Sequence, residues 1–281
     1  MARHGSAGVQ MEERTERQGA PARWRPDPGD LALFRTALER ALRVEGMTAP
    51  FCMRVLDCLL SFQGEEGIDG AILEFGVYKG RSAMLVAHRV RPGEPFVLVD
   101  VAPYVDLPSI REVAPQAVFV ECASEAFPET YPGYRELEGA CRFIHVDSSH
   151  TFETTTAELA MAERLLAPGG LLVLDDFTNL DYPQVAAATY RYLYTSGSGL
   201  MIFLIAGVKA YLCRREDFPR YGDYVLRRLM DEMALRAAPG LCLARTDLHP
   251  EHRAFHLRPR LPGEDEPYYG MRIYRSFYQE P

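Results

Sequence analysis

Short apolar runs alternate with longer amphipathic segments through the middle of this chain, and this alternation constrains its fold more than any other feature. The runs are almost continuously apolar, which is typical of parallel strands covered by helices on both faces. Strands that alternate with helices build right-handed βαβ units. The sequence therefore predicts an α/β fold with a doubly wound, mostly parallel sheet. The five runs are residues 71–75, 95–100, 117–121, 141–147 and 170–176.

Two further apolar runs, 200–206 and 209–214, are separated only by Gly207 and Val208, so we expect a hairpin. This hairpin would complete a Rossmann-like, seven-stranded sheet, with antiparallel strands at the edge formed by the last strands of the sequence. We expect the chain to divide into a disordered or loosely attached arm (1–28), an N-terminal helical cap (29–66), the α/β core (67–215) and a C-terminal helix with an irregular extension (216–281).

Charge and composition argue against several classes of partner. The net charge is −8, whereas a protein that binds nucleic acid usually carries a basic excess. No stretch approaches the ~20 apolar residues that span a bilayer. The first residues mix Arg with Glu and lack the apolar stretch of a secretory signal. Six cysteines without a CxxC pair fit reduced thiols, so we expect a cytoplasmic protein with no nucleic-acid or membrane partner.

A glycine turn follows the first predicted strand, in the order Glu74, Gly76, Tyr78 and Gly80. Gly76 permits a sharp turn and Gly80 a close approach as the next helix begins, with free N–H groups at its start. Tyr78 stands where a dinucleotide fingerprint has its middle glycine, which disfavours a pyrophosphate and favours S-adenosylmethionine. Asp100 ends the second strand, where a carboxylate could bind ribose hydroxyls. A turn without a ligand remains the alternative.

Three carboxylates follow the fourth and fifth predicted strands: Asp147, Asp175 and Asp176. Strands ending at one sheet edge would bring them within one or two strand spacings of ~4.8 Å. Such carboxylates repel unless a cation lies between them, and oxygen ligands favour Mg²⁺, Mn²⁺ or Ca²⁺. His150 lies three residues after Asp147 and could act as a base. The alternatives are strand-end carboxylates that cap helices, and a polar first-turn histidine.

The runs ILEFGVYKGRSA, FIHVDSSHTFETT and LAPGGLLVLDDF resemble the macrocin O-methyltransferase family of class I methyltransferases, over about residues 30–215. The family often reads D-G-D-H where this chain has Asp147-Ser148-Ser149-His150, so support for the histidine could differ. The resemblance implies S-adenosylmethionine on Glu74, Gly76, Tyr78, Gly80, Ser82, Asp100, Cys122, Ala123, Ser124 and Asp147, Mg²⁺ (or Mn²⁺) on Asp147, Asp175 and Asp176, and catalysis by His150 and Asp147.

The resemblance also implies a function: methylation of a hydroxyl on a small molecule, such as the sugar, polyol or phenol of a bacterial natural product or antibiotic. We expect a homodimer or higher homo-oligomer. Two alternatives stay open, a metal-independent S-adenosylmethionine enzyme that acts on nitrogen or carboxylate and a non-catalytic binding protein. Zinc spacing also occurs in the tail, at Asp247, His249, His252 and His256, but Pro250 interrupts the helix that would align these side chains.

Overall fold

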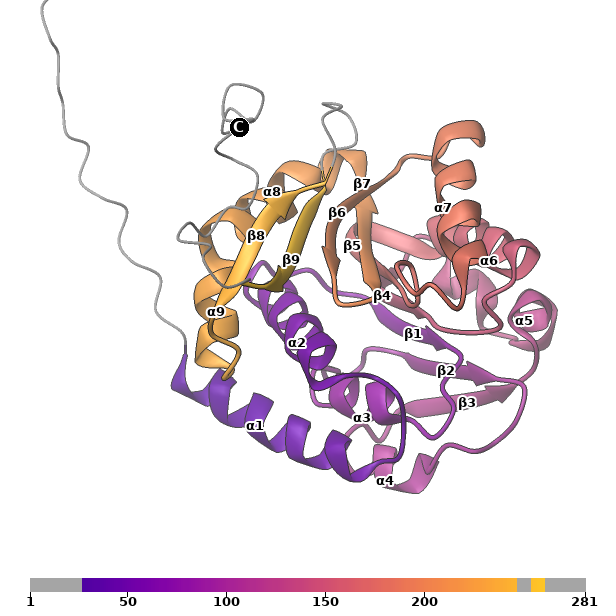
Figure 1. Cartoon of the computed structure of the whole chain (residues 1–281). Helices are drawn as coiled ribbons and strands as arrows, with labels where there is room; N and C mark the ends of the chain where they lie inside the picture. Colours follow the sequence, from indigo (N-terminus) through magenta and orange to yellow (C-terminus); the bar gives the residue numbers. More distant parts are fainter. Residues whose placement is uncertain (1–26, 247–253, 261–281) are drawn as a thin grey trace, which may run out of the picture.

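The computed structural model describes residues 27–246 and 254–260, which form a central sheet with helices packed on it (Figure 1). Residues 1–26 of the predicted arm, residues 247–253 of the stretch with zinc spacing and residues 261–281 of the predicted extension lie outside this part of the chain. The strands are β1 (Ala71–Phe75), β2 (Phe96–Asp100), β3 (Ala117–Glu121), β4 (Cys141–Val146), β5 (Leu166–Leu174), β6 (Leu200–Ala206), β7 (Lys209–Arg214), β8 (Leu241–Arg245) and β9 (Phe255–Pro259).

The predicted α/β class with a mostly parallel sheet is confirmed. The strand order is β3-β2-β1-β4-β5-β7-β6-β9-β8, with β3, β2, β1, β4 and β5 parallel and β7 antiparallel to β5. The chain reverses its direction of travel across the sheet between β1 and β4. In open α/β sheets, ligands bind at the carboxyl ends of the strands beside such a switch point.

The prediction of seven strands is corrected to nine. Strand β9 pairs in parallel with β6 and in antiparallel with β8, and both come from the segment expected to be irregular. Each is only five residues long, and the surrounding sequence is rich in Pro, His and Arg, so the short apolar run at residues 241–244 was not recognised as a strand. They join the sheet because alternate side chains, such as Leu243 and Leu257, are buried in the main core.

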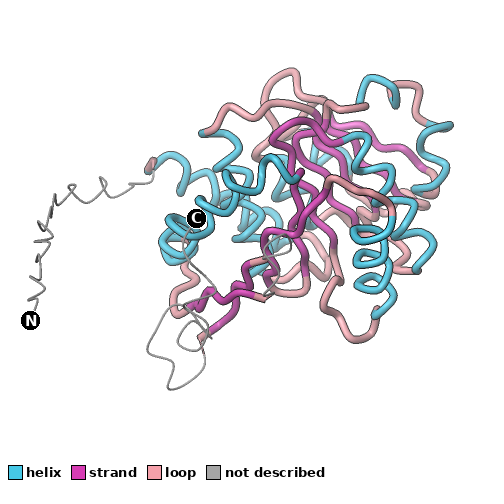
Figure 2. Tube along the Cα trace, turned by 90° about the horizontal axis from the view of Figure 1, so that it is seen from above, coloured by secondary structure: helices cyan, strands magenta, loops and turns pink. Residues whose placement is uncertain are grey.

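Helices cover both faces of the sheet, as Figure 2 shows. One face packs against α1 (Pro28–Arg43), α2 (Pro50–Glu65), α3 (Arg81–Ala87), α4 (Leu107–Arg111), α8 (Phe218–Tyr224) and α9 (Met230–Leu235). The other packs against α5 (Phe127–Thr130), α6 (Phe152–Leu165) and α7 (Pro183–Thr195). Neighbouring strand residues alternate between these cores, as Ile72 and Leu73 do, because successive side chains of a strand point to opposite faces.

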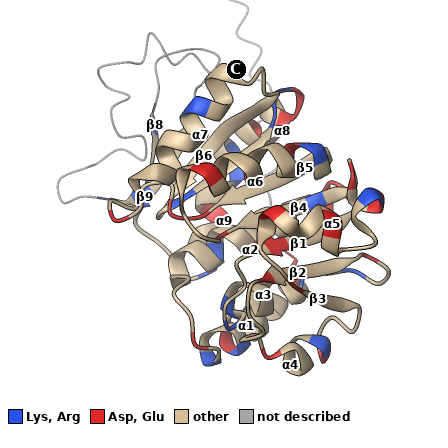
Figure 3. Ribbon diagram, turned by 90° about the vertical axis from the view of Figure 1, so that its right-hand side faces the viewer, with Lys and Arg blue, Asp and Glu red and all other residues tan. Residues whose placement is uncertain are grey.

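Charged residues of both signs are distributed over many elements of the fold (Figure 3). Figure 3 shows Lys and Arg interspersed with Asp and Glu over the side of the molecule that faces the viewer. In the described part of the chain, no helix has the length and apolar character required to cross a membrane.

A buried ion cluster ties the first helices to the last one. The Arg236 guanidinium, after α9, lies 2.7 Å from Asp57 of α2 and 2.7 Å from Asp30 of α1. Arg89, after α3, pairs with the same two carboxylates. Both Arg236 and Asp57 are almost fully buried. The cluster therefore joins segments that are about 200 residues apart in the sequence.

Replacing Arg236 with methionine is expected to lower the free energy of unfolding by about 3–5 kcal/mol, because Asp57 would keep a buried charge with fewer partners. The matched control is Arg227→Met, which removes an exposed pair with Asp223 and should cost about 0–1 kcal/mol. Urea denaturation of both variants measures the difference. Equal losses would contradict a structural role for the buried cluster.

Candidate active site

The glycine turn joins β1 to α3 at the switch point of the sheet. Gly76 has a φ of +77°, and a Cβ there would lie 1.7 Å from the carbonyl oxygen of Asp147, so only glycine fits. Gly80 has a φ of +89° and precedes the first residue of α3. The backbone N–H of Tyr78 donates to the Asp100 carboxylate at 2.7 Å, which fixes the turn to the end of β2.

A cavity of about 500 Å³ opens beside this turn. Most of the residues predicted to bind a cofactor line it, although they come from four different strand ends. Ser82 and Gly80 line a separate space of about 30 Å³ directly next to it. The predicted residues on the larger cavity are Gly76, Tyr78, Asp100, Cys122, Ala123, Ser124 and Asp147.

Glu74 lies below the turn, on β1, and its carboxylate is buried. Its Oε1 accepts a hydrogen bond from the Ser82 hydroxyl and lies 2.9 Å from Nδ1 of His145. Its Oε2 is buried and has no hydrogen-bond partner among the residues that the structure describes. Because buried polar atoms in proteins nearly always form hydrogen bonds, this oxygen is suited to accept a hydrogen bond from a ligand.

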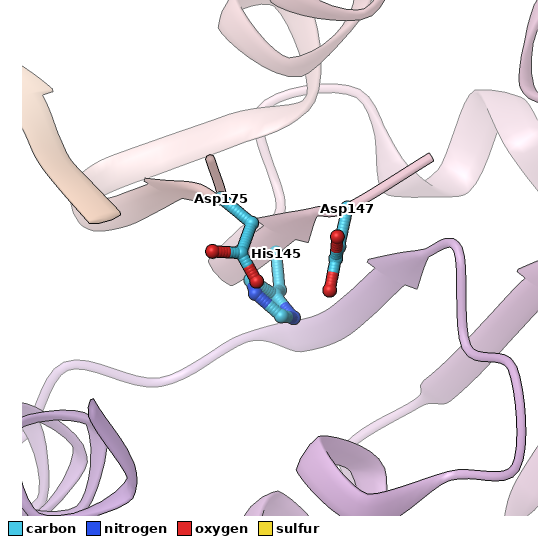
Figure 4. Close-up of side chains that lie close together, drawn as sticks. All are labelled: His145, Asp147 and Asp175. Carbon is cyan, nitrogen blue, oxygen red and sulfur yellow. The ribbon is translucent and has the colours of Figure 1, made fainter. Parts of the chain in front are cut away.

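The strand-end carboxylates meet as the sequence indicates. Val146 of β4 is in register with Leu174 of β5, so the residues that follow, Asp147 and Asp175, are neighbours. Figure 4 shows their carboxylates and the His145 ring pointing toward one another. One ligand atom from each of these three side chains lies within 4.8 Å of the others. Burial and the Asp175 carboxylate raise the pKa of Asp147.

Asp176 belongs to a different group of side chains from Asp175. Its carboxylate groups with Asp147 and His150, so the predicted trio is distributed over two groups that share Asp147. The reason is local: Asp175 and Asp176 are consecutive residues, and Asp176 has a φ of +55°. Among the described residues, no single group of ligand atoms within 4.8 Å of one another includes all three carboxylates.

His150 pairs with the carboxylates on this side. Its Nε2 lies 2.9 Å from Asp176 Oδ2 and 3.3 Å from Asp147 Oδ1. Its ring stacks on Tyr182, with centroids 4.4 Å apart. Hydrogen bonds to Asp147 and Asp176 raise the pKa of His150 to about 10, so in this arrangement the ring is an imidazolium at neutral pH.

Backbone strain gathers at this site. Positive φ angles occur at Tyr78, His150 and Asp176, three of the four non-glycine residues with this conformation in the described part of the chain. Each costs of order 1–3 kcal/mol, and such residues cluster at active sites and ligand-binding positions. Their distribution supports the prediction that the turn, the histidine and the acidic pair form a functional site.

Sequence reasoning missed Lys209 and His145. Lys209 is the first residue of β7; it is buried, ion-paired to Asp175, and 3.1 Å from Nε2 of His145. The Lys209 ammonium holds the pKa of Asp175 well below the usual range, although burial opposes this effect. The available signal was a charged side chain at the start of an otherwise apolar strand.

Glu158 was also missed, and it lies behind the cavity wall. This residue of α6 is buried and accepts a hydrogen bond from Ser148, which lines the cavity. Burial, which outweighs the hydrogen bonds from Ser124 and Ser148, raises the pKa of Glu158 to about 6. Its carboxyl therefore titrates in a range where most glutamates are already ionised.

We expect the wild-type protein to lose about 2 kcal/mol of stability relative to Glu158→Gln as the pH rises from about 4 to 7. The sign follows from the raised pKa, because the folded state binds the proton more tightly than the unfolded state. This stability is fully present below the unfolded pKa and is lost as pH rises through about 6. Urea denaturation across this range measures it. Glu153→Gln, at an exposed position of α6, is the control, and identical pH profiles for all three proteins would refute the assignment.

Comparison with known proteins shows that the part of the chain around this site is similar to a methyltransferase domain. Residues 73–177 match the family model of a methyltransferase domain. These residues include the glycine turn, Asp147, Asp175 and His150. No curated protein sequence matches the chain significantly. The matched model is broader than the macrocin O-methyltransferase family, and membership of that family stays a prediction.

Several solved structures resemble the chain. CalS11, described as a TDP-rhamnose 3'-O-methyltransferase of calicheamicin biosynthesis, is 19% identical with a TM-score of 0.45, over 69% of this chain and 98% of its own. The O-methyltransferase NovP is 16% identical with a TM-score of 0.45, over 58% and 80%. TomG from Streptomyces achromogenes, described as an O-methyltransferase of tomaymycin synthesis in complex with SAM, is 16% identical with a TM-score of 0.43, over 68% and 91%.

Proposed function

We propose that this chain is an S-adenosylmethionine-dependent O-methyltransferase that acts on a hydroxyl of a small molecule, with a divalent metal and His150 as a base. The observation that carries the proposal is the contact between Gly76 and the backbone of Asp147. Through it the glycine turn and the acidic groups meet at one point, as a methyl donor and an activated hydroxyl must. The match of residues 73–177 to a methyltransferase domain supports the same function.

The cavity residues fit S-adenosylmethionine, which supplies the methyl group as an electrophile on a sulfonium. The unpartnered Oε2 of Glu74 is suited to the α-ammonium of its methionine end. Only Oδ2 of the Asp100 carboxylate accepts from the Tyr78 N–H, so the carboxylate would also be able to bind ribose hydroxyls. Cys122 and Ser124, after β3, would lie along adenine. None of these groups requires the phosphate-binding backbone of a dinucleotide site.

The acidic residues fit a divalent metal such as Mg²⁺ or Mn²⁺. Asp147, Asp175 and Asp176 offer only oxygen atoms, which such ions prefer. Burial and the neighbouring Asp175 carboxylate raise the pKa of Asp147, and a bound cation would relieve both effects. When bound, the metal would lower the pKa of the acceptor hydroxyl.

His150 would then remove the hydroxyl proton. Its stack on Tyr182 fixes the plane of the ring, and its distance of 2.9 Å from Asp176 keeps Nε2 at the acidic edge. Asp147 and Asp176 hold the proton on the ring in this arrangement, so the ring becomes a base only when these carboxylates have another counter-charge. The alkoxide attacks the methyl carbon as its bond to sulfur breaks, and the proton remains on His150. The protein contributes mainly by aligning the two reactants.

The acceptor is proposed to carry an apolar body as well as its hydroxyl. Three large exposed apolar side chains line the cavity, and Tyr182 stacks directly on the proposed base. Exposed apolar groups collected at one opening are typical of ligand sites. This suits a hydroxylated natural product, such as a phenol or a glycoside. The lining residues are Met47, Tyr78 and Val101, and the exposed ring of Tyr104 contacts that of Tyr78.

A metal-independent methyltransferase is the second candidate, and one observation favours it. Each acidic side chain already has an internal cation, because Lys209 pairs with Asp175 while His150 pairs with Asp147 and Asp176. In that case these cations alone would orient the acceptor. The cytoplasmic location and the homo-oligomeric state remain predictions from the sequence.

Calorimetric titration of S-adenosylmethionine into the protein, with Mg²⁺ and then with a chelator, tests the proposal. We expect the cofactor to bind in both conditions. We expect methylation of a panel of phenols and glycosides, detected by mass spectrometry, only when the metal is present. Turnover that persists in the chelator would favour the second candidate. Absence of cofactor binding in both conditions would refute methyl transfer and leave a non-catalytic binding protein.

A further inference from the structure

Lys209 places a permanent positive charge beneath the acidic groups. Its side chain is 1% exposed, and its Nζ pairs with Oδ2 of Asp175. The pairing follows from strand register: Leu174 of β5 lies opposite Ala210 of β7, so the residues that flank them face each other. A fully buried lysine is rare unless its charge is paired, which makes this ion pair part of the site's design.

The same ammonium fixes the protonation of His145. A lysine ammonium has three donors and no acceptor. Because Nζ lies 3.1 Å from Nε2 of His145, that nitrogen must accept, and the ring proton must be on Nδ1. Nδ1 then donates to Oε1 of Glu74 at 2.9 Å. Lys209 is thus connected to Asp175 on the acidic side and to Glu74 on the side of the glycine turn.

This arrangement lowers the charge that the acidic groups offer to a metal. The carboxylates of Asp147, Asp175 and Asp176 together carry three negative charges when ionised, and Lys209 offsets the one on Asp175. The ion pair also occupies Oδ2 of Asp175, so this oxygen is less available to a metal ion. A divalent ion would therefore depend mainly on Asp147 and Asp176.

We propose that Lys209 is a positioning residue that acts as a built-in counter-cation for Asp175, so that the site binds a divalent metal weakly and exchangeably. This inference rests on the proposed function, because it assumes that the acidic groups bind a metal. It predicts that a substitution inside the site increases the affinity for the metal. Removing Lys209 should tighten metal binding, whereas damage to the local structure would weaken it.

The test is a titration of Mn²⁺ into the wild-type protein and its variants, without cofactor or acceptor. Calorimetry and electron paramagnetic resonance measure the binding. Lys209→Met should bind Mn²⁺ at least about 10-fold more tightly, because a positive charge close to the ion is lost. Lys209→Arg keeps the charge and should bind as the wild type does. Equal or weaker binding by Lys209→Met, with Mn²⁺ bound by the wild type, would overturn the inference and leave the proposed function standing.

A second comparison covers the case in which Lys209→Met does not fold, since it leaves a buried carboxylate unpaired. Asp175→Asn and the double variant with Lys209→Met contain no such carboxylate. The double variant should bind Mn²⁺ at least about 10-fold more tightly than Asp175→Asn alone. Equal affinities would overturn the inference. Failure of every protein to bind Mn²⁺ would overturn both the inference and the metal in the proposed function, while cofactor titration in the same samples reports separately on methyl transfer.

Discussion

Replacing Gly76 with alanine is expected to weaken the binding of S-adenosylmethionine at least about 100-fold. The added Cβ would lie 1.7 Å from the carbonyl oxygen of Asp147, and both atoms belong to backbone or are attached directly to it. Relief requires the end of β1 to move away from the end of β4, which displaces two walls of the cavity. Calorimetric titration of the cofactor measures the loss.

The control for this experiment is Gly139→Ala. Gly139 also has a positive φ, of +65°, but a Cβ there meets nothing within 4 Å. The substitution Gly139→Ala should therefore lower the free energy of unfolding only by the conformational penalty of about 1–2 kcal/mol. It should leave the affinity for the cofactor unchanged. If both variants keep wild-type affinity at temperatures where circular dichroism shows them folded, the turn does not hold the cofactor.

Replacing Asp147 with asparagine is expected to lower kcat about 1,000-fold, because this carboxylate belongs to both acidic groups. Asparagine keeps the shape but removes the charge that faces Asp175 on one side and His150 on the other. Affinity for a divalent metal should fall in parallel. Steady-state kinetics on an identified acceptor and Mn²⁺ titration measure the two effects.

Asp69→Asn provides the matched control, since Asp69 pairs with Arg91 at an exposed position just before β1, at the opposite edge of the sheet. It should change neither kcat nor metal affinity. Near-normal turnover of Asp147→Asn would rule out Asp147 as the centre of the site and remove the main support for metal assistance.

The sequence was sufficient to predict the strands that build the site. Apolar runs such as 141–147 mark strands buried on both faces, and their period does not depend on distant residues. Parallel strands end at one edge, so the meeting of Asp147 with Asp175 followed from the topology alone. The glycine turn could likewise be predicted from the sequence. A residue with a φ of +77° that packs against the backbone of another strand end must be glycine.

The partners of these residues were not predictable in the same way. Lys209 reaches Asp175 only through the antiparallel register of β5 with β7, 34 residues later in the chain, and no local pattern encodes that register. The pairing of His150 with Asp176 depends on positive φ angles at both residues, which are imposed by tertiary contacts. Strands β8 and β9 are similarly defined by the edge that they join.

The positive φ angles at Tyr78, His150 and Asp176 have a consequence for laboratory evolution. Glycine or asparagine at each position would relieve backbone strain, so a library selected for heat resistance alone should enrich these substitutions. The surviving variants would be more stable and less active if the proposed mechanism holds, because it assigns a role at the site to His150 and Asp176 and places Tyr78 on the cavity. Stabilising campaigns on this scaffold should therefore leave these three codons fixed and draw their gains from loops remote from the carboxyl edge of the sheet.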